Sequence, residues 1–447
     1  MSIHRPPFND LEAWRTFWQE RGQPWRREPE ISEERQQILA TRRLIPPDIE
    51  HGIYPFKGID IKLTRADIEW LLDTHESEGI RGPLDWNDVS HRRREGLDLR
   101  GTDLRCIDLS DLPLSRLRAG FDAAGVNMHY WRNATVEQRE AAAVHLEGAK
   151  LCRTQLQEAT FWRSRLDEAN FEYARLEGAN LSRAHFEGAN LSGTHLEGAD
   201  LTSAFFDNSS SLRDASLGDP EQDFVSVADA RWNGINLALV RWPAGKWDKT
   251  LILGDELAAR RPAHIQSKKR ESKAAVNQMA VHRTKRDETS KPLVRYEVAV
   301  RANRQIAVAL QDQGLNELSA HFSYRAQLLQ QQVLLMQRRY GKYVFSLLLN
   351  GLAGYGYRPL RSLIAYLLVI MVFTTAYYFI GPTINTPLSL PAALVMSVSS
   401  FHGRGFFPGL KVNLDSPMTE FAALEALIGL LIEIIFISTF TQRFFGK

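Results

Sequence analysis

The chain has 447 residues, with 55 Lys and Arg against 53 Asp and Glu, and its formal net charge is +2. This length leaves room for several domains, and the balanced charge argues against a nucleic-acid partner. Two cysteines argue against a disulfide framework. The apolar residues are unevenly spread, because no Asp, Glu, Lys or Arg occurs between Ser362 and Gly403.

Residues 1–96 predict a region of mixed short α and β elements that caps the open end of the domain that follows. Asp10 and Thr64 each stand where a helix N-cap is expected. We expect the Trp-rich face of the first helix to pack within its own domain, and a membrane-surface or partner helix is the alternative. The polar start of the chain predicts no signal peptide and a cytosolic N-terminal part. The inward residues expected are Leu11, Trp14 and Trp18, then Ile68, Leu71 and Leu72.

A period of five residues runs from Val144 to Asn208 without a gap. Each unit has Leu or Phe at its centre and a short residue two positions earlier. Neither a helix nor an ordinary strand has this period, so the repeat decides the fold. The centres are Leu146, Leu151, Leu156, Phe161, Leu166, Phe171, Leu176, Leu181, Phe186, Leu191, Leu196, Leu201 and Phe206.

Such a unit makes one side of a square coil, and four sides give a coil of about twenty residues that climbs one strand spacing, ~4.8 Å. The runs Glu177-Gly178-Ala179-Asn180-Leu181 and Glu197-Gly198-Ala199-Asp200-Leu201 resemble the pentapeptide-repeat family. The resemblance implies a right-handed quadrilateral β-solenoid. We expect this solenoid to span 97–243, with interruptions at 119–143 and 209–229.

The solenoid surface predicts no catalytic or metal site. His145 and His185 share a face but lie two coils apart, with Arg165 between them. Some pentapeptide-repeat proteins are acidic DNA mimics that bind gyrase. Residues 144–208 carry ten acidic and six basic residues, a net charge of −4. This mild charge favours a solvated face. No phosphate loop, metal cluster or paired nucleophile indicates an enzyme, and we expect no cofactor.

Two segments connect the solenoid to the apolar end. Residues 244–293 form a basic linker, which either contacts anionic lipid headgroups or is solvated. Residues 294–340 predict a cytosolic helical hairpin broken at Gly314, which resembles a tetratricopeptide-like hairpin.

The C-terminal part, 341–447, predicts a two-span membrane domain. Residues 363–380 and 421–441 are apolar and long enough to cross a bilayer with their flanks. Arg361 and Arg443 flank them, which places both termini on the cytoplasmic side. The apolar stretch 388–401 is too short to cross, and glycines follow it. These segments follow one another as a span, a short helix, a Gly-containing loop and a second span. This order indicates a re-entrant pore loop.

This part resembles the two-span potassium-channel-type pore family, through Leu424 to Leu431, Arg443 to Gly446 and Gly354 to Leu360. The resemblance implies an α-helical homotetrameric ion channel. The loop departs from the Thr-Val-Gly-Tyr-Gly filter of that family, so potassium selectivity does not follow. The expected pore-loop residues are Ser399, Ser400, Phe401, His402, Gly403, Arg404, Gly405 and Phe406.

The charged residues near the loop leave two orientations open. Arg404 either faces the pore axis or forms an outward salt bridge to Asp415 or Glu425. Glu433 lies in the middle of the second span, and we expect it to line the pore, with pairing to Thr375 or Tyr378 as the alternative. Glu425 is expected on the same side as Glu433. A hinge is expected between them. The pore-lining and gating residues predicted are Glu425, Gly429 and Glu433.

These features predict a weakly cation-preferring channel of a bacterial inner membrane. Its partners are membrane lipid, permeant inorganic ions and further copies of itself, and the solenoid assembles or gates the pore. The alternative is a membrane-anchored scaffold without conductance whose solenoid binds an unknown protein.

Overall fold

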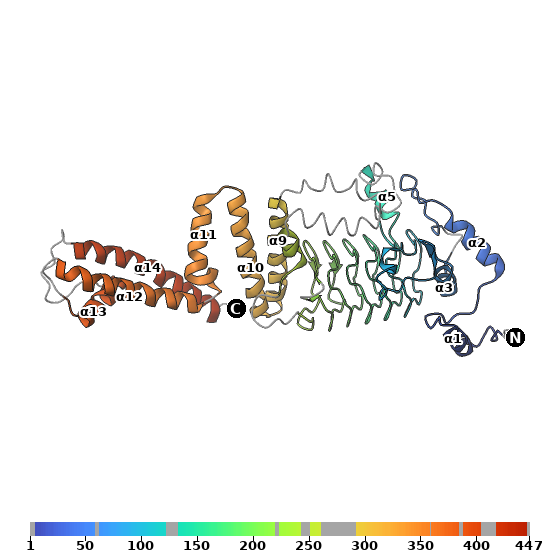
Figure 1. Ribbon diagram of the computed structural model, residues 1–447, viewed down its shortest axis with the longest axis horizontal. Helices are drawn as coiled ribbons and strands as arrows, with labels where there is room; N and C mark the ends of the chain where they lie inside the picture. Colours follow the sequence, from blue (N-terminus) through green and yellow to red (C-terminus); the bar gives the residue numbers. More distant parts are fainter. Residues whose placement is uncertain are drawn as a thin grey trace. The chain divides into compact units, whose positions relative to one another are not determined.

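The computed structural model describes residues 5–58, 62–121, 133–219, 223–242, 251–260, 292–357, 359–383, 388–403 and 417–444. The chain divides into two compact units, Met1–Ser319 and Ala320–Lys447. The first unit holds the coils and the N-terminal helices, and the second holds the long apolar helices (Figure 1). Because the two units are separate, each is described by itself.

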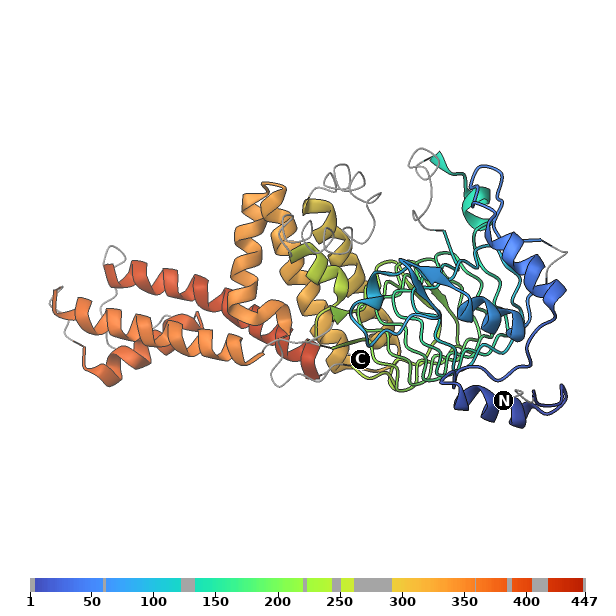
Figure 2. The same ribbon diagram turned by 45° about the vertical axis from the view of Figure 1, so that its right-hand side comes forward.

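The repeat forms the expected solenoid, whose coils stack one behind another (Figures 1 and 2). Parallel backbone bridges join residues twenty positions apart, as between His145 and Arg165 and between Arg165 and His185. The Leu and Phe centres from Leu146 to Phe206 are fully buried, and the small residues beside them are buried too. The period of five therefore predicted both the coil length and its core correctly. The core is a column of stacked side chains rather than a sphere.

The corners of the coil use left-handed backbone conformations two positions after a centre. Gly178 and Gly198 both have a φ of 69° there. Glu158 and Arg163 occupy equivalent corners with φ values of 54° and 59°. A non-glycine residue pays about 1 kcal/mol or more for this conformation. Its regular recurrence shows that the hydrogen bonds between coils outweigh that cost.

The first interruption is inserted into one coil. Asp103 forms a backbone bridge with His145, 42 positions later, whereas bridged residues within the uninterrupted run are twenty positions apart. The insertion contains the short helix α5 (Val136–Glu140). Phe121 and Tyr54 belong to a small core beside the coil, so the insertion is held by the N-terminal region.

Among its described residues, the N-terminal region contains the α-helices α1 (Leu11–Glu20), α2 (Glu33–Arg43) and α3 (Arg65–Asp73). Asp10 and Thr64 cap α1 and α3 as expected. Trp14 and Trp18 are each only 4% exposed, which supports packing within the domain, whereas Leu11 is 54% exposed and lies off that face. The inward residues expected in α3, Ile68, Leu71 and Leu72, are buried.

Helix α3 is fixed to the solenoid by a buried arginine. Arg65 donates hydrogen bonds of 3.0 Å to the carbonyl oxygens of Asp108 and Ser110, and one of 2.8 Å to Glu69. The region also contains two short strands that pair with each other in antiparallel orientation, β1 (Glu76–Ser77) and β2 (Ile80–Arg81), and the 3-10 helix η1 (His91–Arg93).

The second interruption is narrower than the expected 209–229, because Ser211 and Ser216 still bridge the preceding coil. The antiparallel pair of β4 (Gly218–Asp219) and β5 (Asp223–Phe224) lies within it. Coils then resume through the parallel pair of β3 (Phe205–Phe206) and β6 (Arg231–Trp232).

The last coil is closed by a helix that the sequence did not assign to this purpose. Helix α9 (Pro292–Asp312) packs with α6 (Gly254–Arg260), which lies inside the expected linker. The amide of Gln313 accepts from Leu237 N and donates to the carbonyl oxygen of Ile235, both at 2.7 Å. Gln305 accepts from Asp229 N at 2.8 Å. These side chains satisfy backbone groups at an open β edge.

The second unit is helical, with Gly354, Tyr355 and Gly356 all at positive φ between two of its helices. This turn breaks the chain before the first apolar span. The helices are α10 (Asn316–Met336, which begins in the first unit), α11 (Tyr340–Ala353), η3 (Gly354–Gly356), α12 (Pro359–Thr383), α13 (Leu390–Phe401) and α14 (Pro417–Phe444).

Candidate functional site

Two helices of the described residues, at Leu360–Ile380 and Pro417–Ser438, are long and apolar enough to cross a membrane. About half of their side chains are exposed, including Leu367 and Leu427 at 55% and 71%, and few are buried. A contiguous apolar surface of this kind requires lipid or protein to cover it.

The short helix α13 packs on both long helices. Met396 lies in a buried cluster with Tyr377, and Phe401 lies in a second cluster with Ile370. A Cβ on Gly429 would lie 2.1 Å from the carbonyl oxygen of Phe401, which leaves no room for a side chain. The structure therefore gives Gly429 a packing role, and the hinge expected there stays a prediction.

Glu425 is fully buried between the three helices. Tyr377 Oη donates to its Oε2 at 2.8 Å, and Ser397 Oγ lies 2.5 Å from its Oε1. This position differs from the water-facing one that the sequence predicts. The two hydroxyl groups explain the difference, because they satisfy the carboxyl group without water and hold α13 to both long helices.

Glu433 belongs to a second group of hydrogen-bonded side chains, which also includes His402 and Tyr366 and is partly exposed. Its Oε1 lies 2.5 Å from Nδ1 of His402, and the other ring nitrogen lies 3.0 Å from Tyr366 Oη. The side chains of His402 and Glu433 are 33% and 34% exposed. The partner is thus neither Thr375 nor Tyr378, because the end of α13 places His402 closer.

The expected pore loop begins later than the sequence predicts. Ser399, Ser400 and Phe401 form the last turn of α13, whose start is capped by Ser389. Gly403 follows with a φ of 68°, which ends the helix. Arg404, Gly405 and Phe406 lie outside the described residues.

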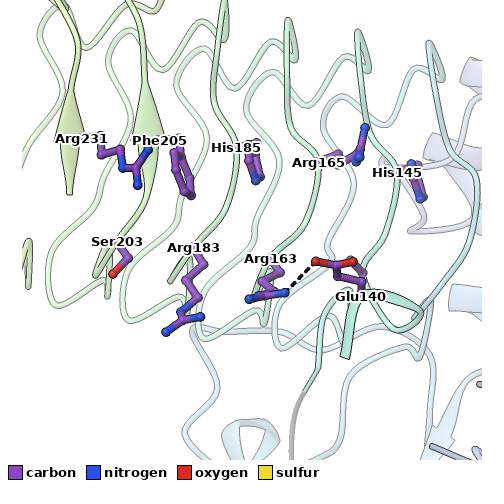
Figure 3. A pocket seen from close by; sticks show the side chains of 10 residues that line it. Glu140, His145, Arg163, Arg165, Arg183, His185, Ser203, Phe205 and Arg231 are labelled. Atoms are coloured by element: carbon purple, nitrogen blue, oxygen red, sulfur yellow. Dashed lines mark hydrogen bonds and ion pairs between the residues drawn. The ribbon is translucent and has the colours of Figure 1, made fainter. Parts of the chain in front are cut away.

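A second candidate site is a groove on the solenoid face, with a volume of about 490 Å³ (Figure 3). Its residues come from successive coils, so side chains twenty positions apart stand in columns. His145, Arg165 and His185 form one column, and the next column includes Arg163 and Arg183. The remaining lining residues are Glu140, Ala143, Ser203, Phe205 and Arg231.

The arginines of this groove have unequal partners. Arg163 pairs with Glu140 at 2.7 Å, and Arg231 lies 4.8 Å from the ring centroid of Phe205. Arg165 and Arg183 are exposed, and neither has a carboxylate within 4.0 Å among the residues that the structure describes. The column of His145 and His185 was expected from the sequence, whereas Arg163 and Arg183 were missed, although residues compared at intervals of twenty would have revealed them.

Three potential metal ligands meet beside the groove, although the sequence predicts no metal site. Ligand atoms of Asp167, His185 and Glu187 lie within 4.8 Å of one another. Partial burial, together with the adjoining carboxyl group of Glu187, raises the pKa of Asp167 to about 6. Only the histidines were compared along the sequence, so Asp167 and Glu187, which are twenty residues apart and therefore stand in one column, were missed.

Comparisons with known proteins concern the repeats. Residues 145–183 and 179–217 match the family model described as pentapeptide repeats. Among solved structures, the pentapeptide repeat protein Rfr23 from the cyanobacterium Cyanothece 51142 is 22% identical, over 32% of this chain and 84% of that chain, with a TM-score of 0.17. HetL, a pentapeptide repeat protein involved in heterocyst differentiation regulation from Nostoc sp. strain PCC 7120, is 19% identical over 36% and 90%, with a TM-score of 0.13.

A trypsin-treated form of QnrB1, a plasmid-mediated fluoroquinolone resistance protein, is 16% identical over 33% of this chain and 80% of that chain, with a TM-score of 0.14. No curated protein matches the chain. Each structural similarity covers about a third of this chain.

Proposed function

We propose that this pentapeptide-repeat protein is a membrane protein whose apolar helices form an ion-conducting pore in a homotetramer. The observation that carries the proposal is the pair of His402 and Glu433, ionisable and one-third exposed among apolar helices. An ionisable residue at the centre of a span costs about 2.5–3.5 kcal/mol, so such residues usually line water or a pathway.

The depth of α13 supports a re-entrant arrangement. This helix packs near Tyr377 at its middle and near Tyr366 at its end. Those two residues of α12 are eleven positions apart, which corresponds to about 16 Å along a helix. Tyr366 lies six positions after Leu360, where the apolar span begins, so the end of α13 lies about 9 Å inside that span. A polar helix end at that depth is tolerated where it meets water or protein.

The proposed orientation places both termini in the cytoplasm of a bacterial cell, at its inner membrane. Arg361 and Arg443 lie at the outer ends of the two spans, and positive flanks favour the cytoplasmic side. The solenoid would then be cytosolic and would assemble or gate the pore. We expect no enzymatic activity.

The proposed selectivity is a weak preference for cations. Four copies of Glu433 around an axis would attract cations into the pore. Arg404 would oppose them if it faced the same axis, and the potassium filter sequence is absent. We therefore expect discrimination by charge sign rather than between potassium and sodium.

The test is current through the purified full-length protein in a planar bilayer under a KCl gradient. We expect discrete conductance with a reversal potential displaced toward that of potassium over chloride. Glu433→Gln should reduce that displacement, because it removes the charge and retains the shape. Glu420→Gln, at the exposed start of α14, is the matched control.

Silence of the wild-type protein across voltage, pH and calcium would contradict the channel. A membrane-anchored scaffold is the second candidate function, and the arginine groove on the solenoid favours it because that surface suits a ligand. Under this alternative the apolar helices serve for anchoring and assembly, and Glu433→Gln leaves partner binding unchanged.

A further inference from the structure

We infer that the groove lined by Arg163, Arg165, Arg183 and Arg231 is a binding site for a small compound that carries clustered phosphate groups. This inference is independent of ion conduction. It rests on two of these arginines, Arg165 and Arg183, which have no carboxylate within 4.0 Å among the described residues, on the size of the groove and on the charges beside it.

The first observation is the contrast between these arginines and others on the solenoid. Arg153 pairs with Asp111 at 2.7 Å, and Arg175 pairs with Glu177 at 2.8 Å. Arg165 and Arg183 have no carboxylate this close within the described part of the chain. Their columns are adjacent, and Figure 3 shows both at the same groove. Neighbouring like charges that have no carboxylate within ion-pair distance form a surface that an anion stabilises.

The second observation is the chemistry of the donors. Each guanidinium group offers a planar fork of N–H donors that matches two oxygens of a phosphate group. Consecutive coils are spaced by about 4.8 Å, so Arg163 and Arg183 can engage neighbouring groups of one ligand. Four arginines and Glu140 give the lining a charge of +3 with neutral histidines. A diphosphate or triphosphate has a comparable opposite charge.

The third observation limits the size of the ligand. The groove has a volume of about 490 Å³, which is typical of sites for small molecules. The column next to His145 and His185 is acidic and consists of Glu147, Asp167, Glu187 and Asp207. A long polyanion such as nucleic acid would lie against these carboxylates and be repelled, whereas a compact one fits within the basic columns.

The aromatic side of the groove is already occupied. His185 and Phe205 stack in parallel with ring centroids 4.5 Å apart, and Arg231 covers Phe205. The space between these two rings is therefore too narrow for a nucleobase to stack there. Recognition by phosphate charge predicts similar affinity for inorganic triphosphate and for a nucleoside triphosphate.

The experiment is isothermal titration of inorganic triphosphate into the full-length protein in detergent. We expect one site per chain, and affinity that falls with ionic strength. The double variant Arg165→Ala/Arg183→Ala should weaken binding at least tenfold. Both residues are exposed and lack ion-pair partners among the described residues, so this variant should fold normally, as circular dichroism can verify.

The matched control is Arg153→Ala/Arg175→Ala, which removes the same charge from other faces of the same solenoid. Equal weakening by this control, or no binding by the wild-type protein, would overturn the inference. Competition distinguishes the source of the phosphate groups. Displacement of triphosphate by a soluble nucleotide supports a free ligand, whereas displacement only by mixed micelles that contain a phosphorylated inositol lipid assigns the site to a headgroup.

Discussion

Nδ1 of His402 lies 2.5 Å from Oε1 of Glu433, which ties the end of the short apolar helix α13 to the middle of α14. Tyr366 of α12 completes the connection at 3.0 Å from the other ring nitrogen. The three residues therefore link all three apolar helices through hydrogen-bonding side chains.

The first prediction concerns this connection. His402→Ala removes the partner of Glu433, and a hydrogen bond to a charged group contributes about 1.5–3 kcal/mol. We expect single-channel current to fall at least tenfold because the end of α13 is no longer fixed. His321→Ala in α10 is the control that leaves current unchanged. A wild-type current from the His402 variant would show that the pair does not organise the pore.

The second prediction concerns close packing. Gly429→Ala would place a Cβ 2.1 Å from the carbonyl oxygen of Phe401, and the backbone of α13 must then move. Overpacking of this kind costs about 1–3 kcal/mol. We expect a lower Tm in detergent. Gly351→Ala in α11 meets nothing within 4 Å and should leave the Tm unchanged or slightly higher.

The third prediction concerns the cap on the last coil. Gln305→Ala/Gln313→Ala removes the amides that contact the backbone at Asp229, Ile235 and Leu237. The exposed β edge then becomes available for pairing with another chain. We expect faster aggregation on mild heating, measured by light scattering. Gln19→Ala/Gln37→Ala, at exposed positions of α1 and α2 in the same unit, serves as the control, and equal aggregation of both variants would refute the capping role.

The fourth prediction is a pH dependence from Asp255. Burial raises its pKa to about 6 from an ordinary value of 3.8, although Val227 N donates to it at 2.8 Å. The folded state therefore binds the proton more tightly than the unfolded state does. The stabilisation of the folded state by protonated Asp255 is complete below pH 3.8 and is lost as the pH rises through about 6.

Asp255→Asn removes this titration. We expect the wild-type Tm to fall between pH 4.5 and pH 7 by an amount equivalent to about 1–3 kcal/mol, and the variant to lack this part of the change. Identical pH profiles for both proteins would contradict the assignment. The comparison between the two proteins cancels the contributions of the other carboxyl groups.

The sequence predicted the solenoid well because the repeat is local. Each Leu or Phe centre needs only its own coil and the next one to be buried, so the period of five sets the core directly. Interruptions were harder to delimit. The coil continues through Ser211 and Ser216 because backbone bridges form even where the Leu and Phe pattern lapses.

The candidate sites depended on contacts that spacing does not encode. Glu425 and Glu433 were expected to share one water-facing side, because helix periodicity alone cannot say what covers that side. Tyr377 and Ser397, from two other helices, turn Glu425 into a buried acceptor. The role of Glu433 as a pore residue stays a prediction.

By itself, the sequence determined the coil of about twenty residues, its apolar column and the two long apolar helices, because these follow from periodicity and composition along the chain. Only the tertiary structure decided which polar groups meet. His402 reaches Glu433 across 31 positions, and Arg163 and Arg183 line one groove because successive coils bring the same corner into register. Hydrogen bonds and ion pairs act over a few ångströms of space, and the fold alone sets those distances.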